Sequence, residues 1–353
     1  MENIAHSLFG AALYRGWFER YLPGTLPLWI IGANLPDLDV ISTLWGKDAY
    51  LRHHRGITHA LPGIILLALA LGSLWWLWRQ VRGQPLPWSR LCLAALVAVG
   101  THPMLDFLNN YGIRPLLPFD DRWFYGDLVF IADPWIWLIL GGALFLQTRR
   151  ELGTMLGWGA LWFLTSGVIV IAQQVPLTSK LIWLIILAML LVLRTRYEEV
   201  KINASRIALA LMLMYLGALY LSQQTALASA DQYLRAQAGE PVRRFSVSPM
   251  AANPLRWEVF ADSENFFYFG KVEVGTVTRS TTPLTALPVA RHHKAVKRAL
   301  DTPQGHTMVE FSRYLLADVE PLEEGARVIL RDGRYARERR AGFSVIEVTV
   351  APD

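Results

Sequence analysis

The sequence predicts a polytopic bundle of transmembrane helices in residues 1–227, followed by a small extracytoplasmic α+β domain in residues 228–353. Hydrophobic residues make up 53% of the chain and charged residues only 18%, whereas soluble domains carry about 25% charged residues. Long apolar runs dominate the first part, and short stretches of alternating apolar and polar residues dominate the tail. The predicted fold class is therefore mainly α, with a mixed second domain.

Charge and cysteine content exclude several classes of protein. The net charge is +5, and the tail from Asp231 carries 17 Lys and Arg against 16 Asp and Glu, so a nucleic-acid partner is not expected. The single cysteine, Cys92, offers neither a disulfide framework nor a cysteine-type zinc site. The N-terminus lacks the basic region of a cleavable signal peptide, so the first spans are expected to act as uncleaved signals.

The first two apolar stretches do not have the form of simple spans. Residues 3–19 predict a helix that is apolar around most of its circumference, with His6 near its start as a ligand or as a polar group satisfied inside the bundle. Residues 25–36 fall short of the roughly 20 residues of a span and predict a half-spanning or re-entrant element. Asp37 and Asp39 follow on a turn or at a helix start, where they are helix caps or metal ligands.

A polar run at residues 47–59 contains His53, His54 and His59. Thr58 is expected to cap the following helix and to place His59 in its first turn. A basic loop that contacts lipid headgroups is the alternative interpretation, but histidine is a poor choice for a permanent positive charge. The histidines of this run are therefore grouped with the two preceding aspartates.

The next two spans carry a second polar pair. Residues 60–78 form a strong span that ends in W-W-L-W, and residues 91–108 return through the bilayer. His102 and Asp106 lie four residues apart, so a helix projects them from the same face, where they can share one metal ion. A polar pair that only bridges two helices is the alternative.

The following loop, residues 109–127, is rich in turn formers, aromatic residues and charge, and suits a substrate rim or an interfacial collar. Residues 128–147 predict another span. Within it, Asp133 precedes Pro134 and is either a further ligand or the cap of a restarted helix. Three more spans have almost no ionisable residues and are expected to be scaffold. They are residues 155–173, 177–193 and 204–222.

The basic loops predict the orientation. The positive-inside rule places residues 79–90, 148–151 and 194–206 in the cytoplasm. The histidine run and the loop 109–127 then face outward, and the tail emerges on the same side. The predicted location is the cytoplasmic (inner) membrane, with several spans and an extracytoplasmic C-terminal domain.

The tail is predicted to combine short strands with two helices. Alternating stretches such as F-S-V-I-E-V-T-V predict strands, and residues 289–300 and 306–316 predict helices. The Asp332-Gly333 pair lies between strand-like runs and predicts a hairpin.

The polar residues of the first part are the types that hold a hydrolytic metal ion. Zinc fits the mixture of histidine and aspartate best, with manganese or iron as alternatives, and two ions would suit phosphoester cleavage. The candidate ligands are His6, Asp37, Asp39, His53, His59, His102 and Asp106, with Asp133 as a further candidate.

The candidate catalytic residues are Asp37, as a general base, and Arg55. Three arginines, Arg52, Arg55 and Arg114, are candidates for binding a phosphate or carboxylate of the substrate by paired hydrogen bonds.

The ordered motifs resemble those of the membrane-bound metal-dependent hydrolase family of the YdjM type. His6, N-L-P-D-L-D at 34–39, H-R-G-I-T-H at 54–59 and T-H-P-M-L-D at 101–106 carry the resemblance. L-P-F-D-D-R-W-F at 117–124, D-P-W at 133–135 and N-P-L-R-W at 253–257 fit the same pattern. The resemblance implies an inner-membrane hydrolase and leaves its substrate open.

A weaker similarity extends to the zinc-dependent phospholipase C and S1/P1 nuclease group. Asp39, His53 and the pair His102 and Asp106 match, in order, positions that bind zinc in those enzymes. The later His-x-x-x-Glu element of that group is absent here, and Asp133 is a candidate to stand in for part of it.

The predicted function is hydrolysis of a phosphoester or other ester of a membrane lipid or lipid-linked molecule at the outer face of the membrane. Two alternatives belong to other classes. One is a non-enzymatic adaptor or sensor with a structural metal, whose four positions would all be filled by protein. The other is an ion or proton transporter, although the ligands cluster toward one face and no internal repeat is visible.

Overall fold

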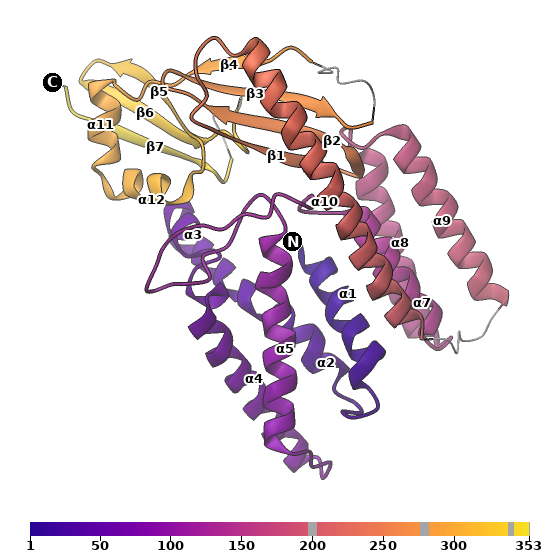
Figure 1. The fold of residues 1–353 in the computed structure, drawn as a ribbon. Helices are drawn as coiled ribbons and strands as arrows, with labels where there is room; N and C mark the ends of the chain where they lie inside the picture. The colour runs from indigo at the N-terminus through magenta and orange to yellow at the C-terminus, as the bar shows by residue number, and fades with distance from the viewer. Residues whose placement is uncertain (197–202, 276–281, 338–341, 353) are drawn as a thin grey trace. The chain divides into compact units, whose positions relative to one another are not determined.

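A computed structural model describes residues 1–196, 203–275, 282–337 and 342–352 (Figure 1). The chain divides into two compact units, each assembled from three pieces of sequence. Unit 1 comprises Met1–Leu38, Ile57–Ser222 and Ser248–Pro254, and unit 2 comprises Asp39–Gly56, Gln223–Val247 and Leu255–Asp353. The main division follows Ser222. Two short segments are exceptions, since Asp39–Gly56 belongs to unit 2 and Ser248–Pro254 belongs to unit 1.

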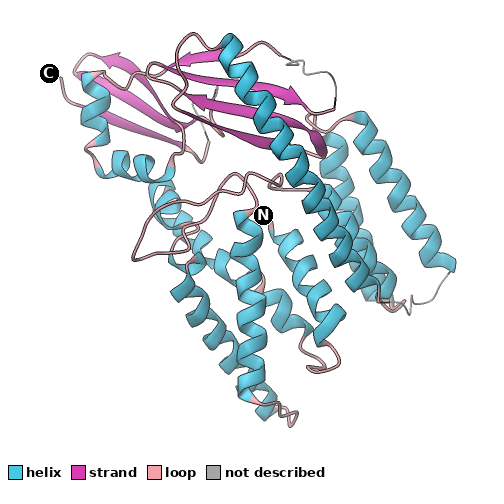
Figure 2. Cartoon of the chain, in the orientation of Figure 1, coloured by secondary structure: helices cyan, strands magenta, loops and turns pink. Residues whose placement is uncertain are grey.

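Helices make up the first part of the chain, and the strands lie in the tail (Figure 2). The helical elements up to the main division are α1 (Asn3–Leu13), η1 (Tyr14–Phe18), α2 (Leu26–Gly32), η2 (Leu35–Trp45), α3 (Lys47–His53), η3 (Ile57–His59), α4 (Leu61–Val81), α5 (Trp88–Phe107), α6 (Pro134–Ile136), η4 (Trp137–Gly141), α7 (Gly142–Gln147), α8 (Leu152–Ile171), α9 (Leu177–Arg196) and α10 (Ala204–Gln237). η1 and η4 are π-helical turns, and η2 and η3 are 3-10 helices.

Five described helices, α4, α5, α8, α9 and α10, are long and apolar enough to cross a membrane. They correspond to five of the six predicted spans. The sixth, predicted at 128–147, is a shorter apolar stretch, Pro134–Gln147, in which a π-helical turn separates two α-helical segments. It falls below the roughly 20 residues of a span because Pro134 starts the helix late.

The α4–α5 hairpin depends on small residues at its contact. A Cβ built on Gly72 of α4 would lie 2.6 Å from Cα and 2.8 Å from Sγ of Cys92 in α5. Gly72 therefore lets the two helices approach to backbone contact, as small residues do between membrane helices.

Gly72→Ala is expected to destabilise unit 1 by about 1–3 kcal/mol, because the methyl group meets backbone rather than a movable side-chain end. Gly100→Ala, on α5 itself, is the matched control, because a Cβ there meets open space in the described structure. The measurement is the thermal unfolding midpoint of the purified protein in detergent. Equal midpoints for the two variants would contradict the predicted packing.

The tail contains two antiparallel sheets, most of whose residues belong to unit 2. One sheet has the order β1-β2-β3-β4 and the other the order β5-β6-β7. The strands are β1 (Arg244–Met250), β2 (Asn253–Asp262), β3 (Phe266–Glu273), β4 (Thr285–Pro288), β5 (Leu315–Leu322), β6 (Gly325–Asp332) and β7 (Val345–Val350). The C-terminal part of α10 packs on the first sheet through Ala226, Ala230 and Tyr233, which meet Trp257 and Val259.

The structure corrects three predictions in the tail. The helix predicted at 289–300 is the shorter α11 (Lys294–Leu300), and the one predicted at 306–316 is α12 (Pro303–Phe311), because Pro303 starts it early and β5 takes the later residues. The hairpin predicted at Asp332-Gly333 is wrong, because β6 ends at Asp332 and its partner β7 begins only at Val345. A two-residue connection joins β5 to β6, where Leu322 pairs with Gly325 and the φ of Gly325 is +102°.

Candidate metal centre

Three elements of unit 1 bring four polar side chains together. Asp37 lies in the first turn of η2, and His59 is the last residue of η3, two residues before α4. His102 and Asp106 lie one turn apart at the C-terminal end of α5, as their spacing predicted. Because α4 and α5 form a packed hairpin, the start of one helix lies beside the end of the other (Figure 1).

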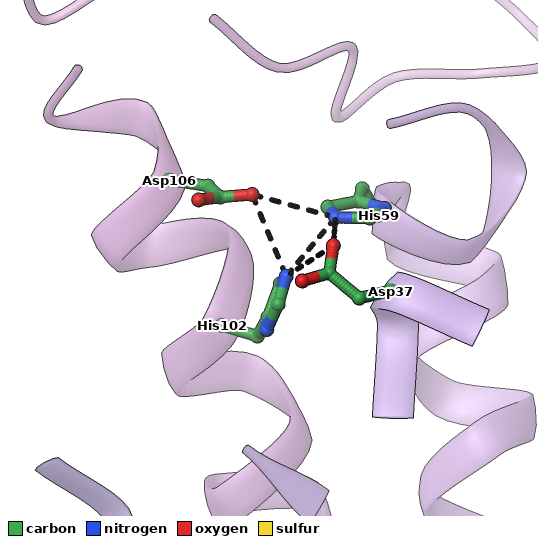
Figure 3. A group of neighbouring side chains, drawn as sticks. All are labelled: Asp37, His59, His102 and Asp106. Carbon is green, nitrogen blue, oxygen red and sulfur yellow. Dashed lines mark hydrogen bonds and ion pairs between the residues drawn. The ribbon is translucent and has the colours of Figure 1, made fainter. Parts of the chain in front are cut away.

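The four donor atoms are spaced as the ligands of a metal ion would be (Figure 3). His59 Nε2 and His102 Nε2 are 3.1 Å apart. Asp37 Oδ1 lies 3.2 Å from His102 Nε2 and 3.6 Å from His59 Nε2, and Asp106 Oδ2 lies 3.4 Å from each nitrogen. A tetrahedral ion with bonds of about 2.0–2.1 Å requires ligand separations of about 3.3–3.4 Å. The cluster could therefore hold a metal ion without rearrangement of its backbone.

The cluster is buried except on one side. His59, His102 and Asp106 have fully buried side chains, whereas the Asp37 side chain is 19% exposed. Burial opposes ionisation of Asp37, but hydrogen bonding with His102 and His59 outweighs it and holds the pKa of the Asp37 carboxyl well below its usual range. Asp37 is therefore ionised, which is the form that binds a cation.

A backbone contact fixes the tautomer of His102. His102 Nδ1 lies 2.7 Å from the carbonyl oxygen of Ala33, and a carbonyl can only accept. Nδ1 therefore donates to this carbonyl, and if a metal ion replaced the proton that Nε2 shares with Asp37, Nε2 would present its lone pair to that ion. Orienting contacts of this kind are usual behind metal-bound histidines.

His6 of α1 lies against the cluster rather than among its four donors. Its ring stacks on that of His102 with centroids 3.9 Å apart. Its Nε2 lies 3.4 Å from Asp106 Oδ1, the oxygen that also contacts the amino group of Met1. The predicted ligand His6 therefore contacts His102 and Asp106 without being one of the four grouped donors.

Asn3 and Asn34 position Asp37, and neither was among the site residues predicted from the sequence. Asn3 Nδ2 donates to Asp37 Oδ2 and to Asn34 Oδ1, each at 3.1 Å. Asn34 in turn donates to Ser7 Oγ at 2.9 Å. The signal was present, since Asn34 opens the N-L-P-D-L-D motif and Asn3 lies three residues before His6 on the same helix.

Asn3→Leu is expected to weaken metal binding by roughly 10–100-fold, the usual effect of removing a group that orients a ligand. The measurement is competition for zinc with a chelating dye. Asn110→Leu is the matched control, because Asn110 Nδ2 donates to Ser248 Oγ at 3.0 Å within unit 1. Unchanged affinity in Asn3→Leu would remove Asn3 from the site.

The remaining predicted ligands lie outside this four-residue cluster, and Asp39 belongs with His54 to a second group of potential metal ligands. Asp39 and His53 belong to unit 2, where Asp39 pairs with His54 Nδ1 at 2.8 Å and with the Arg55 amide at 2.9 Å. His53 is an exposed residue at the end of α3. Asp133 caps α6, accepting from the Trp135 amide at 2.9 Å. The helix-cap alternative for Asp133 is thus the one that the structure shows.

The prediction that Thr58 caps the next helix is wrong. The N-cap of α4 is Ala60, and His59 lies in η3 instead of the first turn of α4. Pro62 in the first turn of α4 has no backbone N–H, so this turn has one fewer donor for a capping hydroxyl to accept from. Thr58 Oγ1 lies 3.0 Å from His59 Nδ1 instead, so the residue orients the predicted ligand.

The three candidate arginines are divided between the units. Arg52, in unit 2, donates to Thr307 Oγ1 at 2.9 Å, and Arg55, also in unit 2, is buried with φ +55°. Arg114, in unit 1, is buried with its guanidinium 4.7 Å from the centre of the Trp123 ring. The next carbonyl, of Pro115, accepts from the Leu61 amide at 3.0 Å, which fixes this loop to the start of α4 near His59.

Comparisons with known proteins agree with a membrane location. Residues 1–176 match a family model described as YdjM inner membrane protein. The uncharacterized protein YfhP of Bacillus subtilis (strain 168) is 28% identical to this chain over 109 residues. The aligned segment covers 31% of this chain and 32% of YfhP, so it spans only about a third of that relative. No solved structure matches the chain significantly.

Proposed function

Residues 1–176 of this chain belong to the YdjM inner membrane protein family, and we propose that this multi-pass membrane protein is a metal-dependent hydrolase. The observation that supports it most directly is the convergence of His59 Nε2 and His102 Nε2 with two carboxylate oxygens at metal-ligand spacing. The donor set of two imidazoles and two carboxylates suits zinc best, with manganese or iron as alternatives.

A bound ion would supply a water of lowered pKa and a Lewis acid for the bond under attack. The protein residues hold the site in place for that chemistry. His102 presents one nitrogen because Ala33 binds the other, and Asn3 fixes the free oxygen of Asp37. Asp37 is the donor at the exposed edge, so it is the one placed to meet a substrate and to act as a general base if released from the ion.

The proposed substrate is a phosphoester or other ester of a lipid or lipid-linked molecule at the outer face. The ligands lie at the ends of α4 and α5 opposite to Arg79, Arg82 and Arg90, and the positive-inside rule assigns those arginines to the cytoplasm. Arg114 is the candidate for binding the phosphate, since its loop is fixed to the start of α4. Arg52 and Arg55 remain proposals in the same role.

A second candidate is an adaptor or sensor with a structural metal. Four protein donors are the number that closes a structural zinc site, whereas catalytic zinc usually keeps three protein ligands and one water. The two candidates differ in whether an exchangeable water reaches the ion.

The test is metal-dependent hydrolysis by the full chain in proteoliposomes. Protein stripped with chelator and reloaded with zinc or manganese is offered phospholipids and a lipid diphosphate, and phosphoester cleavage is measured. We expect cleavage that is lost in Asp106→Asn and retained in His53→Ala, whose histidine is exposed in unit 2. A loaded protein that binds one ion firmly, cleaves nothing and shows no exchangeable water would favour the structural metal.

A further inference from the structure

The 3-10 helix η2, Leu35–Trp45, presents an apolar stripe to its surroundings. With three residues per turn, side chains at positions i, i+3 and i+6 lie above one another. Leu38, Ile41 and Leu44 occupy one such row and are 61%, 58% and 78% exposed. The exposed row of this helix is therefore made of large aliphatic side chains.

The row beside it has the opposite character. Pro36 and Ser42 are buried and Asp39 is half-buried, and the Ser42 hydroxyl donates to the Asp39 carbonyl at 2.6 Å. Asp39 and Ser42 thus face the protein, whereas Leu38, Ile41 and Leu44 face outward. The exposed Trp45 is the last residue of η2, and Gly46 with φ +105° turns the chain before the polar Lys47.

The elements that carry the other metal ligands indicate that lipid covers this apolar row. Ile57 and Leu61, on either side of His59, are exposed, and so are Met104 and Phe107, on either side of Asp106. These residues lie at or beside the ends of α4 and α5, where His59, His102 and Asp106 also lie. The metal cluster therefore lies at a level where unit 1 exposes apolar side chains.

The dimensions of η2 exclude a span. Eleven residues at about 2 Å each give roughly 22 Å, less than the ~30 Å of the hydrocarbon core. An apolar row on an element of this length is typical of a helix lying in the plane of the interface, and a tryptophan at its end is typical of the headgroup level.

We propose that η2 is an interfacial helix that inserts its Leu38–Ile41–Leu44 row into one leaflet and gives the metal cluster lateral access to membrane-resident substrates. The helix begins with the exposed ligand Asp37, next to Leu38 in sequence, so the accessible edge of the cluster and the inserted row belong to one element. The substrate class that follows is an amphiphile with its ester at the headgroup level and its apolar chains left in the bilayer. The substrate class rests on the proposed hydrolase function. Insertion into the leaflet rests only on the exposed apolar row of η2.

Insertion is measured without activity. In full-length Cys92→Ala protein, which then lacks cysteine, Leu44→Cys and Lys47→Cys are each labelled with an environment-sensitive fluorophore and reconstituted into vesicles. We expect a blue-shifted label at position 44 that is quenched by lipids carrying a nitroxide near the headgroup, and a water-exposed label at position 47. A label at 44 in water, or one shielded without lipid quenching because protein covers it, would overturn the proposal.

Substrate access is measured with two esters that share one headgroup. One has long acyl chains and is presented in vesicles, and the other has short chains and is soluble. We expect Leu44→Asp to lower hydrolysis of the long-chain ester by roughly tenfold or more, the factor that corresponds to burial of a leucine side chain. The short-chain rate should be unchanged, as should both rates in Lys47→Ala.

The outcomes separate the two proposals. If wild-type protein cleaves neither ester, the hydrolase function fails, and the fluorophore result still decides insertion. If wild-type protein cleaves both esters and Leu44→Asp changes neither rate, the function stands and lateral access is refuted.

Discussion

Replacement of His102 by alanine is expected to reduce the bound metal from about one ion per chain to a trace, since a tetrahedral site loses one of four donors. The affinity for the metal should fall by more than roughly 100-fold, because losing a group that only orients a ligand already lowers it by up to about that factor. The His59 nitrogen, 3.1 Å from the deleted one, and the two carboxylates would remain. The measurement is elemental analysis of the purified protein after dialysis against a weak chelator.

The control for this experiment is His53→Ala. His53 stands in the same histidine-rich run as His59, yet it is exposed in unit 2 and should leave the metal content unchanged. Folding of His102→Ala is checked separately by its thermal midpoint. Full metal content in a folded His102→Ala protein would mean that the four residues are a polar helix contact and that the ion, if any, binds elsewhere.

Asp332→Ala is expected to lower the free energy of unfolding of unit 2 by about 3–5 kcal/mol, the usual cost of leaving one partner of a buried ion pair behind. Asp332 and Arg334 are both buried, and Arg334 donates to Asp332 through Nε at 3.1 Å and Nη2 at 2.7 Å. Asp332 also accepts from the Arg313 amide at 3.0 Å. Its removal strips the main anion from a buried guanidinium.

Hydrogen exchange of the β6 amides in the full chain measures this loss. Asp231→Ala is the matched control, because its ion pair with Arg235 is exposed on α10 and should contribute less than about 0.5 kcal/mol. Similar exchange rates in the two variants would show that Asp332 is dispensable for the second sheet.

The half of the candidate metal centre that depends on local helix geometry could be predicted from the sequence. His102 and Asp106 lie four residues apart inside a long apolar run, and a helix places such a pair on one face whatever surrounds it. The apolar spans were predictable for the same reason, since length and hydropathy are local properties.

The other half depends on tertiary structure. The run at 47–59 breaks into α3 and η3, so His53 and His59 end in different units although they are six residues apart. Of the aspartates of N-L-P-D-L-D, Asp37 joins the four-residue cluster, whereas Asp39 pairs with His54 in a second group of potential ligands. No local pattern distinguishes the members of either pair, because their difference arises only when distant segments pack.

The tail shows the same division. Strand-like alternation located the sheet residues, but Asp332-Gly333 did not form the hairpin that its composition favours. Asp332 does begin a tight turn, in which the Tyr335 amide donates to the Asp332 carbonyl at 3.1 Å and the Arg334 amide donates to the Asp332 side chain at 2.8 Å. The local preference for a turn was met, but the strand that pairs with β6 begins only at Val345, so the turn does not close a hairpin.

The segment Ser248–Pro254 belongs to unit 1 although it follows the last span in sequence, and this order matters during synthesis. The Ala252 carbonyl in this segment accepts from Trp135 Nε1 at 3.3 Å and from Ser179 Oγ at 2.9 Å. These bonds cannot form until the ribosome has released a stretch far downstream of the last span. Because segments that emerge first ordinarily fold first, the inserted helices must wait in the bilayer with this part of their packing incomplete. A nascent chain arrested before residue 248 should therefore be more sensitive to protease in unit 1 than one arrested well after residue 254.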